Sequence, residues 1–413
     1  VRHARGTSVV ITNHHILFDG WSGPLVLADL LALYATGTPF TGQGTGERTD
    51  FADYLARIAD ADLDAGLAAW RRVLEPVDEP TLVAPGLTGA SVEDHGSDTA
   101  AAHLPREHRW VLDPDLVAGL ERTARQSGST MATALQLAWA VLLSRLTDNR
   151  VVTFGETVSG RPAGLDGVES MVGLFINTLP AVVDVDPDAT IAEVLGRLQA
   201  DKTAVLDHQH IGLPEILTAV GRPQLFDTLT VHESYPVDND SLAGGAASAA
   251  VGLSIRDVEV SDATHYPLNL ATSPTASGIA VRLTYLPDAF ADDEVAVFAR
   301  SLDRILWAIA GDARTRIGDI PPMSEVDQTR LDTWSAGPEL IPTGTHVADL
   351  LLERAAASPA TIAVVSPEGE STYAELASRV SVLARRLVGL GVGPEVAVGV
   401  CIPRSTEMIV AVH

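Results

Sequence analysis

The sequence predicts an α/β fold in which helices pack on a mixed β-sheet. Two observations favour this class: short β-branched runs recur along the chain, and amphipathic segments with helical spacing separate several of them. The 413 residues are 46% hydrophobic and 20% charged, a composition typical of a well-packed protein rather than a disordered one. This length allows two or three domains.

The first predicted elements are a strand, a polar loop and a helix. Residues 8–12 form a β-branched run, which predicts a buried strand that ends at a polar cluster. Ser22 is expected to cap the helix that follows. The apolar face of this helix would consist of Leu27, Leu30, Leu31 and Tyr34. A second amphipathic helix is predicted over residues 51–74.

Further strands and helices are predicted along the rest of the chain. We expect a strand around Trp110, then a helix opened by Pro114. Other strand-like runs are residues 151–156, 179–185, 228–231, 252–260 and 279–286. Other predicted helices cover residues 129–146, 191–206, 292–309, 347–357 and 373–390. Cys401 lies in an apolar run and is expected to be buried in a strand.

Charge and composition exclude several classes of function. The formal charge of -26 repels phosphate backbones and anionic lipid surfaces, so neither nucleic acid nor membrane is an expected partner. A single cysteine excludes a disulfide framework or a cysteine-based metal site within the chain, and no metal is expected. No signal-peptide core is present, and a cytoplasmic location is expected.

The most informative local pattern is His14-His15-Ile16-Leu17-Phe18-Asp19-Gly20. Neighbouring residues at the end of a strand point to opposite sides, so one imidazole would project into a cleft while the protein holds the other. An imidazole can give or take a proton near neutral pH, which suits a general acid or base. Asp19 would orient the loop by an ion pair, and Gly20 would adopt backbone angles that a side chain forbids.

This pattern resembles the His-His-x-x-x-Asp-Gly signature of the condensation-domain superfamily, which also contains chloramphenicol acetyltransferase-like acyltransferases. Other segments follow in the order found in condensation domains: residues 154–162, 171–180, 207–210, 222–228, 233–236 and 265–268. The resemblance implies a chloramphenicol acetyltransferase-like fold of two lobes around a central active site. The first lobe is expected to be incomplete here, because its early segments are missing.

The resemblance also implies roles for individual residues. His15 is the catalytic position, either as a general base for the acceptor amine or as a donor that positions or stabilises the tetrahedral intermediate; His14 and Gly20 complete its motif. Asp19 is expected to be structural and paired with an arginine, for which Arg161 is the candidate. Four further motif positions are expected to line the substrate channel or to support the structure: Ser159, Arg161, Phe175 and Asn177.

The C-terminal part is similar to the start of an adenylation domain. The segment Ser371-Thr372-Tyr373-Ala374-Glu375-Leu376 resembles the first core motif of that family. The phosphate-binding loop of the family is absent, so we expect no ATP site in this sequence. The predicted organisation is therefore as follows. Residues 1–80 belong to the first condensation lobe, 81–106 to a linker, 107–320 to the second lobe, 321–340 to a linker and 341–413 to the adenylation start.

The expected function is amide-bond formation in nonribosomal peptide synthesis, between acyl groups carried as thioesters on phosphopantetheine arms. The partners would be the upstream and downstream peptidyl carrier domains and the rest of the synthetase, with no cofactor bound directly. The residues of the His-His motif and of the segment that ends at Pro162 resemble those of condensation domains that accept a D-configured donor. Two alternatives stay open: a stand-alone acyltransferase of the same superfamily, and a non-catalytic segment that docks carrier domains.

Overall fold

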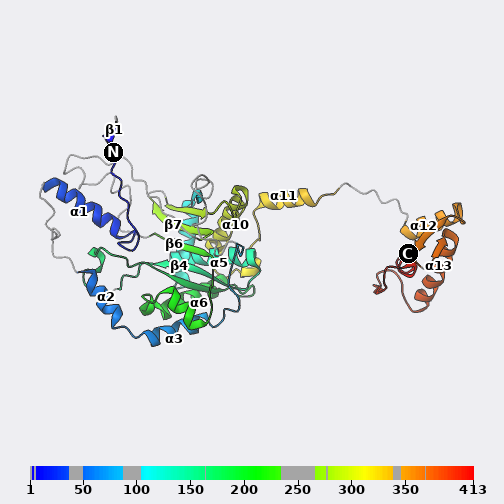
Figure 1. The fold of residues 1–413 in the computed structure, drawn as a ribbon, viewed down its shortest axis with the longest axis horizontal. Helices are drawn as coiled ribbons and strands as arrows, with labels where there is room; N and C mark the ends of the chain where they lie inside the picture. Colours follow the sequence, from blue (N-terminus) through cyan, green and yellow to red (C-terminus); the bar gives the residue numbers. More distant parts are fainter. Residues whose placement is uncertain are drawn as a thin grey trace. The chain divides into compact units, whose positions relative to one another are not determined.

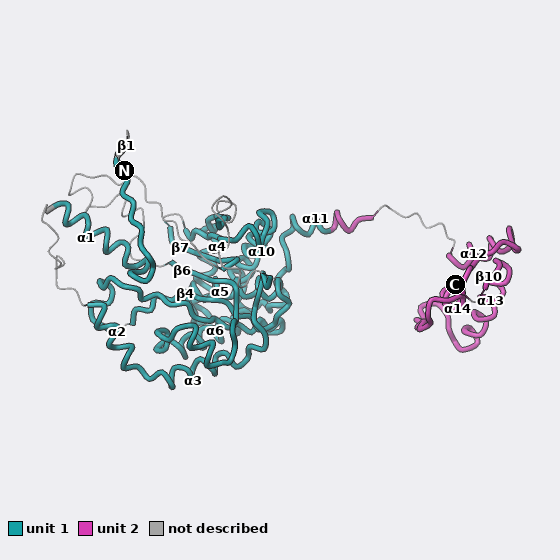
Figure 2. Tube along the Cα trace, viewed as in Figure 1, with its two compact units in different colours: residues 1–331 teal, residues 332–413 magenta. Residues whose placement is uncertain are grey.

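The chain forms two compact units (Figure 2). Unit 1 is Val1–Leu331 and unit 2 is Asp332–His413. The computed structural model describes residues 2–3, 6–36, 50–86, 104–162, 164–233, 266–275, 278–337, 346–367 and 369–413. The strand-like run 252–260 and part of the motif segments 233–236 and 265–268 lie outside the described residues.

A six-stranded mixed sheet forms the centre of unit 1 (Figure 1). Its strand order is β3-β8-β7-β6-β4-β5. The strands are β3 (Arg106–Val111), β4 (Val151–Val158), β5 (Asn177–Asp184), β6 (Thr228–His232), β7 (Leu268–Thr275) and β8 (Gly278–Tyr285). The β4–β6 and β6–β7 pairs are parallel and the others are antiparallel, which confirms the predicted mixed α/β class.

Helices cover both faces of this sheet. The larger core joins the strands to α4 (Pro114–Gln126), α5 (Met131–Thr147), α6 (Ile191–Ala204) and α10 (Asp292–Gly311). A second core lies under α3 (Leu63–Leu74) and α7 (Leu213–Val220). Trp139 and Phe154 are fully buried in the first core and Trp70 in the second, so large aromatic side chains anchor both layers.

Side-chain caps explain where several helices begin. Asp113 accepts a hydrogen bond from the backbone at the start of α4, whose first residue is Pro114 as predicted. Thr130 caps α5 in the same way. Thr190 and Glu193 form a reciprocal capping box on α6.

The remaining elements of unit 1 are short or lie near its ends. They are β1 (Arg2–His3), β2 (Gly6–Thr7), α1 (Ser22–Thr36), α2 (Phe51–Ala59) and the first part of α11 (Glu325–Ser335). Helix α11 lies inside the segment predicted as the linker 321–340. Asp327 fixes its start, because the carboxylate accepts hydrogen bonds from Arg300 at 2.6 and 3.0 Å and from Ser324 at 2.6 Å.

In the described residues of unit 2 that follow α11, helices pack on a hairpin. Its elements are α12 (Val347–Ala357), β9 (Ile362–Ser366), β10 (Gly369–Thr372), α13 (Tyr373–Gly389) and α14 (Thr406–Val412). The helices at 347–357 and 373–389 agree with the prediction. Cys401, in contrast, is exposed and lies outside any strand, so its predicted burial was wrong. Strands β9 and β10 pair with each other, and no described strand pairs with the run around this cysteine.

Two predictions near the N-terminus were also wrong. Residues 8–12 are not a buried strand, and Val9 and Val10 are 72% and 76% exposed. A β-branched run becomes a strand only beside a pairing partner, and β1 and β2 pair only with each other among the described strands. On α1 only Leu31 of the predicted apolar face is buried, whereas Leu30 and Tyr34 are exposed.

The helix predicted over residues 51–74 is divided in two. Helix α2 ends at Ala59 and α3 begins at Leu63. The Asp62 side chain accepts a hydrogen bond from the amide of Ala65 and so caps α3, which makes a new helix start more favourable than continuation. The spacing of apolar residues does not reveal where one helix ends and the next begins. Both helices bury an apolar side chain, Tyr54 in α2 and Trp70 in α3, so the pattern looks continuous.

Candidate active site

The loop that carries the paired histidines precedes α1. The amide of Leu17 donates to the carbonyl of His14 at 3.0 Å, and the amide of Ile16 donates to the His14 Nδ1 atom at 3.1 Å. The His14 ring is therefore held by its own loop. The His15 side chain is exposed, and so is that of His14. Solvent exposure therefore does not distinguish the two imidazoles, and the predicted contrast between a projecting and a held ring stays a prediction.

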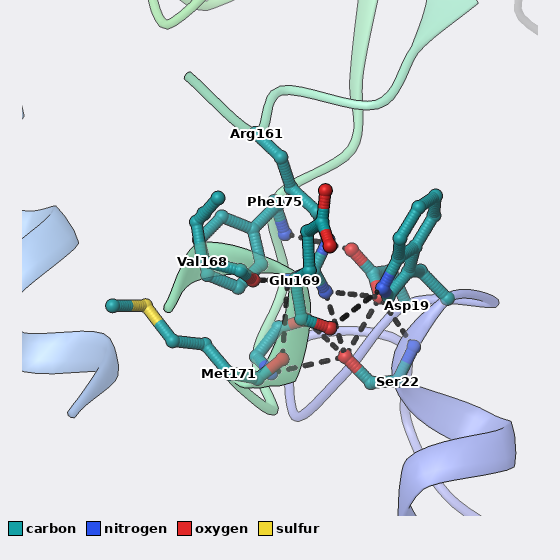
Figure 3. A network of polar contacts seen from close by, with 9 residues as sticks. Asp19, Ser22, Arg161, Val168, Glu169, Met171 and Phe175 are labelled. Carbon is teal, nitrogen blue, oxygen red and sulfur yellow. Dashed lines mark hydrogen bonds and ion pairs between the residues drawn. The ribbon is translucent and has the colours of Figure 1, made fainter. Parts of the chain in front are cut away.

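Asp19 is buried at the end of this loop, and its carboxylate makes four contacts (Figure 3). Oδ1 accepts from the Ser22 amide at 2.9 Å, from the Ser22 hydroxyl at 2.8 Å and from Arg161 at 3.3 Å. Oδ2 accepts from the amide of Phe175 at 3.1 Å. Three of these four contacts fall on Oδ1 and one on Oδ2, so both oxygens of the carboxylate are held by the protein.

Arg161 is the cation that faces Asp19, as the sequence predicted. The ion pair is 3.3 Å long, and the side chains of the two residues are 5% and 0% exposed. The guanidinium also donates to the carbonyl oxygens of Val168 and Met171 (Figure 3). Burial lowers the pKa of Arg161, and the Asp19 carboxylate acts in the opposite direction.

Aromatic rings surround the guanidinium of Arg161. Its central carbon lies 3.9 Å from the Phe175 ring centroid and 5.4 Å from that of Trp21. Phe175 in turn packs on Tyr54 and Phe51 of α2, at centroid distances of 4.6 and 4.9 Å. Burial raises the pKa of Tyr54, although nearby Arg161 lowers it. The rings thus exclude water from the ion pair and add cation–π attraction.

The other predicted site residues have different environments. Ser159 is exposed at the end of β4. Asn177 donates from Nδ2 to the carbonyl oxygens of Gln209 and Ile211, both at 2.8 Å, and so ties β5 to the loop before α7. Phe175 is buried beside Arg161 rather than exposed. The contacts of Phe175 and Asn177 therefore agree with the structural alternative for these two positions.

Two local predictions in the motif were wrong. Ser22 does not cap α1 from outside; it is the first helical residue, and Asp19 accepts the hydrogen bond from its amide. Asp19 can do this because it lies three residues before Ser22, at the spacing of a helix cap. Gly20 does not have a positive φ, whereas Gly160 does, at 62°.

Three contacts of this network were not predicted from the sequence. The indole Nε1 of Trp21 donates to the carbonyl of Glu169 at 2.9 Å. The hydroxyl of Ser22 and the backbone of Gly173 are buried against each other. Trp21 and Ser22 directly follow the motif, so their position was the available signal, but their partners lie about 150 residues further along the chain.

Gly160 is required where the chain turns out of β4. A Cβ atom at this position would lie 1.7 Å from the carbonyl oxygen of Phe175. We expect Gly160→Ala to destabilise unit 1 far more than Gly128→Ala, which has a similar φ of 64° but open space around it. The strained φ should cost roughly 1–2 kcal/mol in both variants. Chemical denaturation of both variants checks this, and equal losses would contradict the steric argument.

A small cavity of about 20 Å³ lies away from this network, beside the Lys202–Glu156 ion pair. Trp70 of α3 also lines it. A volume of this size holds about one water molecule, so it is not a substrate site. In the described part of the chain, no group of three or more His, Cys, Asp or Glu side chains could hold a metal ion. Nor does any described helix have the length and hydrophobicity to cross a membrane.

His232 on β6 is a half-buried titratable group near the same ion pair. Its Nδ1 lies 2.9 Å from the Thr272 hydroxyl, and burial, followed by the charge of Lys202, lowers its pKa. As pH falls below about 6.5, His232 takes up a proton in the unfolded chain before it does so in the folded one. The folded state therefore loses stability as pH falls from about 6.5 to the lower pKa of His232 in the folded state. We expect His232→Asn to flatten the fall in melting temperature between pH 7 and 5. As a control, His346→Asn at an exposed position of unit 2 should leave the pH dependence of unit 1 unaltered. If the melting temperature of His232→Asn falls as steeply with pH as that of the wild type, His232 is not the group responsible.

Unit 1 matches a known protein family along its whole length. The condensation-domain model matches residues 1–331, the same residues as unit 1. The chain belongs to the condensation-domain family. A second model, described as AMP-binding enzyme, matches residues 351–413. The predicted resemblance to a condensation domain followed by the start of an adenylation domain is therefore confirmed.

The curated relatives that the chain matches are far longer than the chain itself. The chain is 34% identical over 412 residues to a linear gramicidin synthase of Brevibacillus parabrevis, covering 97% of this chain and 8% of the relative. It is 33% identical over 432 residues to chondramide synthase of Chondromyces crocatus, covering 97% and 11%. The chain thus spans about a tenth of the length of these relatives.

Solved structures confirm the predicted fold class. A four-domain nonribosomal peptide synthetase bound to AMP and glycine matches with a TM-score of 0.62 at 17% identity, covering 92% of this chain and 29% of that one. The first condensation domain of the CDA synthetase matches with a TM-score of 0.55 at 21% identity, covering 75% and 66%. At these identities the likeness concerns the fold alone. The finer lobe and linker boundaries stay predictions, as does a cytoplasmic location.

Proposed function

We propose that this chain forms amide bonds between an acyl or peptidyl donor and an aminoacyl acceptor in nonribosomal peptide synthesis. The observation that carries the proposal is the family match over unit 1, together with a His-His-x-x-x-Asp-Gly loop whose Asp19 is held by Arg161. Both substrates would arrive as thioesters on the phosphopantetheine arms of carrier domains. The adenylation-like segment at 351–413 favours this function over a stand-alone acyltransferase.

In the proposed reaction the acceptor amine attacks the donor thioester carbonyl. A carbon–nitrogen bond forms, the carbon–sulfur bond breaks, and the donor arm leaves as a thiol that takes up the proton lost by the amine. His15, which is exposed in the loop that Asp19 holds, would either accept the amine proton or stabilise the tetrahedral intermediate. Holding both substrates side by side would supply a large share of the rate enhancement by proximity.

The network around Asp19 supports different roles for two residues of the loop, one structural and one catalytic. Four contacts hold the Asp19 carboxylate, and the amide of Asp19 donates to the carbonyl of Gly173 at 3.1 Å. The backbone four residues after His15 is therefore attached to the segment between β4 and β5. We propose that Asp19 and Arg161 position the loop while His15 acts on the substrates.

The test is a competition between two acceptors in a synthetase module that contains this chain. One acceptor is an aminoacyl group on the downstream carrier domain, and the other is the same amino acid as its coenzyme A thioester. We expect rapid amide formation on the carrier and slow formation on the coenzyme A acceptor. Equal rates would favour a stand-alone acyltransferase, and no amide in either case would favour a non-catalytic docking segment.

A further inference from the structure

Ser22 is the most completely engaged hydroxyl at the site. Its side chain is fully buried, and it lies within hydrogen-bond distance of Asp19 Oδ1 at 2.8 Å and the Gly173 carbonyl at 3.1 Å. It accepts hydrogen bonds from Arg161 at 3.2 Å and from the Gly173 amide at 3.1 Å. A hydroxyl has one proton to donate and two lone pairs, so every hydrogen-bonding position of Ser22 is in use.

These contacts join two parts of the chain that are distant in sequence. Asp19 and Ser22 end the loop that carries His15, whereas Arg161 and Gly173 belong to the segment between β4 and β5. Gly173 is itself held against α2, since a Cβ atom there would lie 2.3 Å from the Phe51 ring. The Ser22 hydroxyl thus attaches the loop to a segment that has little room to shift.

We propose that Ser22 is a positioning residue for the condensation reaction, acting by holding the His15 loop in register with residues 160–175. The proposal rests on the function proposed above. Removing the hydroxyl leaves the buried amide of Gly173 without an acceptor and releases one contact of Arg161. Because small displacements of a catalytic group reduce rates strongly, Ser22→Ala should lower kcat by about 10- to 100-fold. The KM for the loaded acceptor carrier should change by less than about twofold, because Ser22 is too buried to contact a substrate.

The chain offers a matched control for loss of stability alone. Ser324 donates to Asp327 at 2.6 Å, and Asp327 pairs with Arg300, so this cluster has the same Ser-Asp-Arg composition. It lies at the start of α11 rather than in the His15 loop. Ser324→Ala should lower the melting temperature without lowering kcat. Ser22→Thr, which keeps a hydroxyl, should restore a large part of the activity lost in Ser22→Ala.

The experiment measures kcat and KM in the full module at a temperature where all variants are folded. A kcat for Ser22→Ala within twofold of wild type, or no lower than that of Ser324→Ala, would overturn the proposal. A second readout needs no activity: amide hydrogen exchange of residues 15–19 in the 413-residue chain. We expect faster exchange at Leu17 and Asp19 in Ser22→Ala but not in Ser324→Ala. Unchanged exchange would overturn the positioning role, whereas a wild-type module that forms no amide would refute only the proposed function.

Discussion

Replacing His15 with alanine should reduce product formation by about 10²- to 10⁴-fold, the range expected for loss of a general acid or base. The reason is that His15 is the proposed acid or base, on a loop whose far end is held by Asp19 and Arg161. The change leaves the hydrogen bonds of Asp19, Ser22 and Arg161 in place, so the fold should persist. The measurement is single-turnover transfer from a loaded donor carrier to a loaded acceptor carrier.

The control for this experiment is His108→Ala, which removes an imidazole from the edge strand β3. It should leave product formation close to the wild-type rate. Loading of both carrier domains has to be equal in the two variants, so that the comparison reports the condensation step. If His15→Ala forms product at the wild-type rate, the catalytic role of His15 is refuted, although the family membership of the chain is unaffected.

Among single substitutions at the candidate site, we expect Arg161→Ala to lower the free energy of unfolding of unit 1 the most. It leaves the buried Asp19 carboxylate without its cation, and removing one partner of a buried ion pair costs about 3–5 kcal/mol. It also removes the hydrogen bonds to the carbonyl oxygens of Val168 and Met171 and the contact with the Phe175 ring. Arg161→Lys should recover little of this, because an ammonium group cannot donate in several fixed directions.

The matched control is Arg314→Ala, which breaks an ion pair with Asp312 in which both side chains are largely exposed. Exposed ion pairs contribute little to stability, so this variant should unfold at nearly the wild-type denaturant concentration. Urea unfolding of both variants followed by tryptophan fluorescence provides the comparison. Similar midpoints for Arg161→Ala and wild type would show that the buried pair does not hold unit 1 together.

Much of unit 1 could be predicted from its sequence because its helices and strands obey local rules. Pro114 after Asp113 marks the start of α4, and alternating burial along β8 follows the period of a strand. Some predictions failed where the outcome depends on distant partners. Residues 8–12 have the composition of a strand, but no described strand pairs with them.

At the candidate site, too, residues in a local motif could be predicted, whereas contacts between distant residues could not. The motif spacing singled out the loop of His14, His15 and Asp19. The resemblance suggested His15 as the catalytic position and Arg161 as the partner of Asp19, and Arg161 does contact Asp19. The contact between Ser22 and Gly173 was missed, since a hydrogen bond from a buried hydroxyl to a distant backbone carbonyl leaves no pattern in the sequence. Their contact spans 151 positions and exists only because the segment between β4 and β5 folds against the start of α1.

The function proposed for unit 1 is to join two carrier-bound acyl groups at the loop of His15. Intact-mass analysis of the acceptor carrier domain, after mixing with loaded donor and the module, is the decisive measurement. The acceptor carrier should gain the mass of the donor acyl group, and this gain should depend on His15. An acceptor carrier of unchanged mass, with both phosphopantetheine arms verified as loaded, would refute the proposed function.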